Sequence, residues 1–340
     1  MSINVNNNND LIDRIGENLD RLISFDINGR GIALELYTAA RKLQLYPLTT
    51  TAAIALKRVI RPQSPVLFVT GFPSLTWLLK GLVETDGPIG VAYLARILDE
   101  AFGVIPMVVT SELYIRVVSA ALQGAGLIVS DMPTAVRSKI ERDTASVAGV
   151  IPFTSDRVQG EMAAKDLLLK IQPAVIISIE APGPARDGKY HTMKGRVIPD
   201  ELVVNGGALF KAASELGILT IGIGDGGNEL GTGQIGETTR KVVPNGEHIA
   251  CIVPSDITVM ASISNWGAYA VGASIAALVN KPNLLLEIDV ETIIRRAVDS
   301  GAVDGVINRP LYSEDRVPML QTKNALSLMH SMIKQTLLNG

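Results

Sequence analysis

Residues 219–233, LTIGIGDGGNELGTG, carry the pattern that decides the fold. The stretch opens with an apolar run, Leu219–Ile223, and passes at Gly224 into a turn that is dense in glycine. A continuous apolar run bounded by glycine is typical of a strand that is buried on both faces of a sheet. The run Ala174–Ile179 ends in the same way, at Glu180. Both runs therefore predict buried strands whose carboxyl ends are followed by acidic side chains.

Apolar runs of this kind recur along the chain and alternate with segments of helical periodicity. The predicted strands are Val66–Thr70, Ile105–Thr110, Gly126–Ser130, Val147–Ile151, Ala174–Ile179, Leu219–Ile223, Ile249–Val253 and Leu284–Ile288. Between them the predicted helices include Gly90–Phe102, Glu112–Gln123, Asp156–Ile171 and Gly207–Leu216. This alternation predicts an α/β fold in which a largely parallel or mixed sheet is covered by helices on both faces. Ligands of such sheets bind at the carboxyl ends of the strands.

The chain is predicted to have two parts, a helical N-terminal extension over residues 1–62 and an α/β domain over residues 63–340. The predicted helices of the extension are Leu11–Ile23, Gly31–Leu45 and Thr49–Ile60. The first ten residues are rich in Asn and predict disorder.

The composition favours a small-molecule partner. The chain has 31 Lys and Arg against 34 Asp and Glu, well interspersed, so neither nucleic acid nor a membrane surface is expected to bind. Its N-terminus lacks the basic and apolar regions of a signal peptide, so the cytoplasm is the expected location. Residues 257–280 approach the length of a membrane span, but Asn265 and Trp266 within them favour a buried core helix, suited to the interface of a homo-oligomer.

The glycine-rich turn at 222–233 also carries three side chains with oxygen atoms, Asp225, Asn228 and Glu229. Hard divalent ions prefer such ligands, and Gly226 and Gly227 would let the backbone approach a substrate. The alternative is an ordinary flexible turn. The single Cys251, predicted to be a buried small hydrophobe, and three His do not supply a zinc site. The phosphate-loop and dinucleotide patterns are missing, so ATP and NAD are not expected.

A second acidic motif, Glu84-Thr85-Asp86-Gly87-Pro88, precedes a predicted helix. Glu84 and Asp86 reach one metal ion only if the chain bends between them, which the Gly-Pro pair permits. Thr85 and Gly87 are then expected to contact the substrate. The alternative role for Asp86 is to cap the helix.

The loop that follows Glu180 concentrates ionisable side chains. Asp187, Lys189, Tyr190 and His191 are the best candidates in the chain for general acid and base. The alternative is a polar surface loop, with His191 in a structural role.

These motifs together resemble the D-glutamate cyclase family: TGF at 70–72 with ETDGP at 84–88, DGKY at 187–190, and GDGGNELGTG at 224–233. The resemblance covers about residues 66–330 and makes the α/β domain the catalytic one. It implies a metal-dependent hydro-lyase that converts D-glutamate, a small acidic amino acid, to 5-oxo-D-proline and water. It implies a divalent metal, Mn²⁺ ahead of Mg²⁺ or Ca²⁺. The implied ligands are Glu84, Asp86, Glu180, Asp225 and Glu229, with further site roles for Asp187 and Asn228.

Two other functions stay open. The motifs ETDGP and GDGGNE also resemble those of haloacid-dehalogenase-like phosphatases, although Glu84 holds the place of their Asp nucleophile and residues 77–83 predict a helix before it. A non-catalytic protein that binds a metal or an amino acid would use the same acidic side chains. Such a protein would gain thermal stability from its ligand and leave the ligand unchanged.

Overall fold

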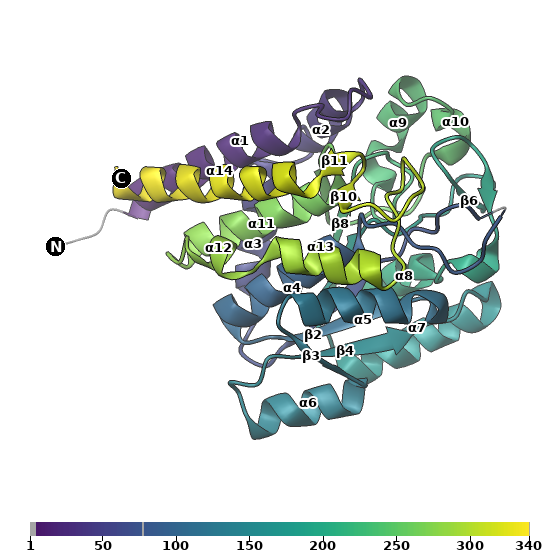
Figure 1. Ribbon diagram of the computed structural model, residues 1–340, viewed down its shortest axis with the longest axis horizontal. Helices are drawn as coiled ribbons and strands as arrows, with labels where there is room; N and C mark the ends of the chain where they lie inside the picture. The colour runs from purple at the N-terminus through teal and green to yellow at the C-terminus, as the bar shows by residue number, and fades with distance from the viewer. Residues whose placement is uncertain (1–4, 77, 340) are drawn as a thin grey trace.

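The computed structural model describes residues 5–76 and 78–339, and a seven-stranded sheet forms its centre (Figure 1). The strand order is β3-β4-β2-β1-β5-β8-β9, and every neighbouring pair is parallel. The strands are β1 (Pro65–Val69), β2 (Ile105–Thr110), β3 (Ile128–Ser130), β4 (Val147–Pro152), β5 (Val175–Ile179), β8 (Leu219–Gly224) and β9 (Ile257–Met260). The predicted α/β fold is confirmed.

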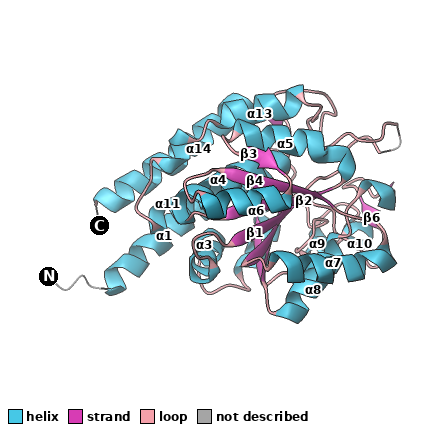
Figure 2. Cartoon of the chain, turned by 90° about the horizontal axis from the view of Figure 1, so that it is seen from below, coloured by secondary structure: helices cyan, strands magenta, loops and turns pink. Residues whose placement is uncertain are grey.

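Helices cover both faces of the sheet (Figure 2). One face carries α4 (Pro88–Phe102), α5 (Ile115–Gly124), α11 (Ser264–Leu278), α13 (Val290–Asp299) and α14 (Met319–Leu338); the other carries α6 (Met132–Glu141), α7 (Arg157–Ile171) and α8 (Gly206–Leu216). Successive side chains of a strand point to opposite faces. Accordingly Val66 and Phe68 of β1 belong to the first core, whereas Leu67 and Val69 belong to the second.

The N-terminal segment is helical, as predicted, with α1 (Val5–Ile23), α2 (Ala33–Arg41) and α3 (Leu48–Val59). Leu19, Leu36 and Leu56 are buried in the same cluster as α11, so these helices share the core of the α/β body. The prediction of disorder covers the first ten residues, of which residues 5–10 lie in the first turns of α1. For residues 1–4 it lies outside the described part of the chain.

Two predicted strands are helical or irregular. The run predicted as a strand at 249–253 contains the last residue of the short helix α10 (Gly246–Ile249) and continues without regular structure. The edge of the sheet is instead formed by β9, whose residues were predicted to begin the helix at 257–280. Within the run at 249–253 the Cys251 amide donates to the carbonyl of Gly227 at 2.9 Å. Its thiol is buried as predicted, and burial raises its pKa to about 12. The run at 284–288 forms the short α12 (Leu284–Glu287), because a short apolar run does not distinguish a strand from a helix.

Irregular segments complete the chain at the carboxyl ends of the strands. Two small hairpins are β6 (Tyr190–His191) with β7 (Val197–Ile198), and β10 (Ser313–Glu314) with β11 (Val317–Pro318). The short helices are α9 (Gly236–Val242), η1 (Glu112–Tyr114), η2 (Asp200–Leu202) and η3 (Gly233–Ile235). Residues 78–83 lack regular structure and end in an isolated bridge at Val83, rather than forming the predicted helix. Among the described helices, none combines the length and apolarity needed to cross a membrane.

The strand order locates a crevice. The strands that follow β1 in the chain, β2 to β4, all lie on one side of β1 in the sheet. The chain then crosses to the other side of β1, where β5 pairs with it. The two chain directions diverge at the carboxyl ends of β1 and β5, and parallel sheets bind ligands at such a point.

Candidate metal and substrate site

Two acidic residues follow neighbouring strands at this crevice. Ile179 of β5 pairs with Ile223 of β8, so Glu180 and Asp225 leave the sheet at the same edge. Glu180 has a φ of +44°, a left-handed conformation that is unfavourable for a residue with a side chain and is concentrated at functional sites. Gly87 packs directly against it: a Cβ on Gly87 would lie 3.0 Å from Glu180 Cβ. The predicted strand ends therefore bring their carboxylates together.

A third acidic residue, Asp315, enters from the turn between β10 and β11 and was not predicted. Asp315 and Arg316 have φ values of +47° and +70°, the pattern of a tight type I′ hairpin turn that normally favours Asn and Gly. The buried Asp304 holds the turn, because its Oδ2 accepts the Arg316 amide at 2.7 Å and the Ser313 hydroxyl at 2.6 Å. The turn thereby directs the Asp315 carboxylate towards the crevice.

The carboxylates form two overlapping groups that are suited to a metal ion. Within each group, one oxygen from every member lies within 4.8 Å of the others. The groups are Asp86 with Asp225 and Asp315, and Glu180 with Asp225 and Glu229. All five residues are buried, and Asp225 belongs to both groups. Four of the five predicted ligands therefore lie together, whereas Glu84 borders the cavity outside both groups.

The donor atoms also fit a cation. Asn228 Oδ1 and Asp225 Oδ2 are buried, and neither accepts a hydrogen bond from the described residues, although Asp225 Oδ2 forms an ion pair with Arg30. Buried oxygens of this kind are expected to have a partner, and carboxylate and amide oxygens are the ligands of Mg²⁺, Mn²⁺ and Ca²⁺. The residues present thus fit the divalent ion that the sequence predicts.

Electrostatics point the same way. Burial, reinforced by the neighbouring carboxylates, raises the pKa of Glu180, Asp86 and Asp315 well above the usual range. Burial and the Asp225 charge raise the pKa of Glu229 to about 7. Crowded carboxylates in a low-dielectric site oppose ionisation, and a bound cation would reverse that effect.

Backbone amides fix two of the carboxylates in position. Asp86 accepts the amides of Ser264 at 2.9 Å and Asn265 at 2.7 Å, at the start of α11. Glu229 accepts the amides of Gly226 at 2.7 Å and Gly227 at 2.8 Å. The first four amides of a helix have no acceptor within the helix, so the N-terminus of α11 can bind the Asp86 carboxylate.

The other predicted substrate contacts surround the same carboxylates. The Gly87 amide donates to Asp86 Oδ1 at 3.1 Å and to Asn265 Oδ1 at 2.8 Å. Thr85 is buried, and its hydroxyl has no hydrogen-bond partner among the described residues. Asn228 borders the cavity, whereas Gly226, Gly227 and Gly87 use their amides to hold carboxylates. Contact of these residues with a substrate stays a prediction.

The carboxylates open into a cavity of about 270 Å³ that also has basic walls. Arg30, Lys194, Arg196 and Arg316 line it together with Glu84, Glu180, Asp225 and Asp315. Arg30 comes from the turn between α1 and α2, and its Nη2 lies 2.9 Å from Asp225 Oδ2. No motif marked this arginine in the sequence. A cavity with both signs of charge suits a ligand that carries carboxylates and an ammonium group.

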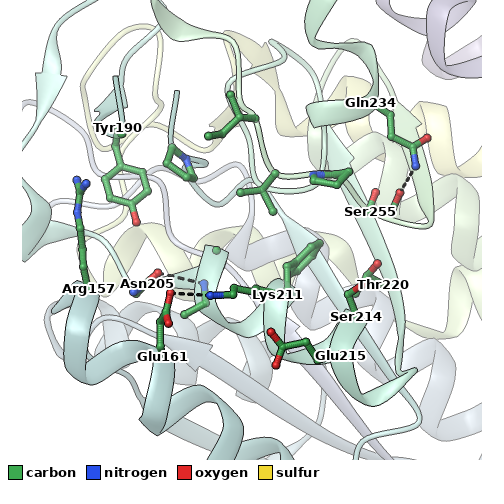
Figure 3. Close-up of a pocket in the computed structure, with 18 of the residues that line it drawn as sticks. Arg157, Glu161, Tyr190, Asn205, Lys211, Ser214, Glu215, Thr220, Gln234 and Ser255 are labelled. Carbon is green, nitrogen blue, oxygen red and sulfur yellow. Dashed lines mark hydrogen bonds and ion pairs between the residues drawn. The ribbon is translucent and has the colours of Figure 1, made fainter. Parts of the chain in front are cut away.

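The predicted acid and base residues lie beside this cavity rather than on its described wall. His191 is buried, with Nε2 at 3.0 Å from Asp187 Oδ2, and its carbonyl accepts a hydrogen bond from Asn228 Nδ2 at 2.9 Å. Lys189 and Asp187 are exposed. Tyr190 faces a second cavity of about 720 Å³, where Figure 3 shows its ring beside Arg157. The catalytic roles of these four residues stay predictions.

Residues further along the same hairpin line the carboxylate cavity instead. Thr192, Met193, Lys194 and Arg196 all border it, between β6 and β7. The loop identified in the sequence therefore reaches the site, but through residues one to five positions beyond His191. The direction of the hairpin turn decides which of its side chains face inward, and no local sequence pattern predicts that direction.

Comparisons with known proteins identify the family of this chain. The model of the family described as D-glutamate cyclase-like, C-terminal, matches residues 19–330, so it includes helices that the sequence resemblance left outside. A curated relative, the mitochondrial D-glutamate cyclase of Homo sapiens, is 31% identical over 217 residues, which cover 63% of this chain and 33% of the relative. The chain thus matches about a third of the relative's length. It belongs to the D-glutamate cyclase-like, C-terminal family.

Proposed function

We propose that this chain is a metal-dependent D-glutamate cyclase, a lyase that converts D-glutamate to 5-oxo-D-proline and water. Family membership and the activity in the name of the human relative support the proposal. The observation that carries it is the cavity itself, where two carboxylate groups that share Asp225 lie in one site with basic side chains. That pairing suits a metal ion and an acidic amino acid in one site.

The metal would be held through Asp225, with Glu180 and Glu229 or with Asp86 and Asp315. When bound, a divalent ion supplies Lewis-acid activation of the γ-carboxylate. Mn²⁺ is favoured over Mg²⁺ and Ca²⁺, in keeping with the family resemblance. The basic residues that line the cavity would hold the substrate folded, with its amine near the γ-carbon, which removes the entropic part of the barrier.

Glu84 is proposed to move the protons. Its carboxylate borders the cavity and accepts no hydrogen bond from the described residues. Burial, with a smaller contribution from the charges of nearby carboxylates, raises the pKa of Glu84 well above the usual range. Ring closure forms a bond from nitrogen to the γ-carbon and breaks a carbon–oxygen bond there. The ammonium nitrogen loses two protons, and the departing oxygen takes both to become water. Glu84 would accept a proton from nitrogen and return it to that oxygen.

The two alternative functions are less well supported by the site. In a haloacid-dehalogenase-like phosphatase an Asp nucleophile directly follows a central strand, whereas Thr70 and Gly71 follow β1. A binding protein would share the cavity, and turnover alone separates it from an enzyme. The cytoplasmic location and the homo-oligomeric state remain predictions.

The proposal is tested with the purified chain, D-glutamate or L-glutamate, and either Mn²⁺ or a chelator, with 5-oxoproline followed by chiral chromatography. We expect 5-oxo-D-proline from the D-isomer only, and only with metal. Glu84→Gln should lower the rate by about 10²–10⁴, the usual contribution of a general acid or base. Absence of product from either isomer, while Mn²⁺ raises the melting temperature, would reject the cyclase reaction and favour a binding protein.

A further inference from the structure

Arg30 is presented to the cavity by a fixed turn. The Asp26 carboxylate accepts the amides of Arg30 at 3.0 Å and Gly31 at 2.7 Å. The Asn28 side chain donates to the carbonyl of Ser262 at 3.2 Å, and the Ser262 amide in turn donates to the carbonyl of Ile23 at 2.7 Å. These bonds join the turn between α1 and α2 to the segment that follows β9. The guanidinium therefore has a defined starting position.

The guanidinium is bound to protein mainly through Nη2. Nη2 donates to the Ser262 carbonyl at 2.8 Å and lies 2.9 Å from Asp225 Oδ2, whereas Nη1 reaches Asp225 Oδ1 only at 3.4 Å. Nε is buried and has no acceptor among the described residues. A guanidinium is always charged, and a buried donor without an acceptor is unfavourable. Because the Nε–H lies on the Nη2 edge of the guanidinium, Nη1, whose one partner among the described residues is the long contact with Asp225, is the donor left for a ligand carboxylate.

Arg30 differs from the other basic residues of the cavity. Lys194, Arg196 and Arg316 are exposed, whereas the Arg30 side chain is 22% exposed and already lies against Asp225. A charged hydrogen bond in a partly desolvated position discriminates between ligands more strongly than a surface charge does. Arg30 is thus the best-placed group to recognise an anion beside the carboxylate groups.

We infer that Arg30 binds a carboxylate of the substrate through Nη1 and selects dicarboxylates. The inference rests on the proposed function, which supplies a substrate with two carboxylates. It also makes the N-terminal helical segment a contributor to the active site. The chemistry at the γ-carbon is unchanged by it, because Arg30 recognises the ligand without exchanging a proton.

The test uses the Mn²⁺-loaded full chain and a probe that cannot cyclise. Glutarate has two carboxylates and no amine, and butyrate lacks the second carboxylate. Isothermal titration should show that Arg30→Gln weakens glutarate binding by about 10–100-fold, with a smaller loss in Arg30→Lys and little change for butyrate. Mn²⁺ affinity should stay within about threefold in both variants. Arg137→Gln, an exposed residue of α6, is the matched control and should bind glutarate as the wild type does.

Each other result has a defined meaning. A parallel loss of Mn²⁺ and glutarate affinity in Arg30→Gln would overturn the inference, because Arg30 would then only position Asp225. Unchanged glutarate binding in that variant, or no glutarate binding by the wild type, would also overturn it. Glutarate binding that depends on Arg30, in a protein that makes no 5-oxo-D-proline, would support the inference while rejecting the proposed reaction.

Discussion

Asp225→Asn should weaken Mn²⁺ binding by at least about a hundredfold and lower cyclase activity by about 10²–10³. Asp225 belongs to both carboxylate groups, so its removal leaves neither group complete. The amide keeps the shape of the side chain but loses the charge, and the ion pair with Arg30 is lost with it. Titration calorimetry gives the metal affinity, and chromatography of 5-oxoproline gives the activity.

The control for this variant is Asp166→Asn, which removes an exposed carboxylate from α7. It changes net charge by the same amount and should leave both quantities unaltered. If Asp225→Asn bound Mn²⁺ as tightly as the control did, the ion would have to be held elsewhere.

Gly222→Ala should lower the free energy of unfolding by about 3 kcal/mol, at the upper end of the cost of overpacking a core. A Cβ on Gly222 would lie 2.7 Å from the Cα of Gly231 and 2.9 Å from its carbonyl carbon. These are backbone atoms, so the loop that carries Asp225 would have to move away from β8. Chemical denaturation measures the stability, and Mn²⁺ titration should show a weakened site in the protein that remains folded.

Gly207→Ala is the matched substitution. Gly207 lies in the first turn of α8, and a Cβ there would meet its nearest neighbour at 3.6 Å, an ordinary contact. Alanine is favoured over glycine in a helix, so this variant should be as stable as the wild type or more stable. Equal stability of the two alanine variants would show that the loop does not depend on the close approach at Gly222.

Local sequence patterns were sufficient for much of the sheet. The strands β1, β2, β5 and β8 are continuous apolar runs that end at glycine, threonine or an acidic residue, and each was predicted near its observed bounds. The edge strand β9 was missed because its residues lead into the apolar, small-residue helix α11 after only a few positions. Whether a short segment becomes an edge strand depends on the neighbouring strand it pairs with, and hydrophobic periodicity over a few residues does not predict that pairing.

The site was predictable where it depends on strand ends. Glu180 and Asp225 each follow a buried strand, and parallel strands place such residues at one edge of the sheet. Asp315 and Arg30 were not predictable, because each reaches the cavity through a turn that is held by contacts distant in sequence. Tyr190 was predicted as a catalytic candidate because its loop is rich in ionisable side chains, but the Tyr190 side chain faces another cavity. The composition of a loop does not predict the direction of each of its side chains.

The most direct test of the account is to locate Mn²⁺ by anomalous diffraction from crystals of the wild-type chain. The account predicts a peak at coordination distance, about 2.0–2.6 Å, from the Asp225 carboxylate and from at least one further member of its two groups. That peak should disappear in Asp225→Asn. A peak remote from Asp225, or no peak at saturating Mn²⁺ in a protein that converts D-glutamate in the presence of chelator, would contradict the account.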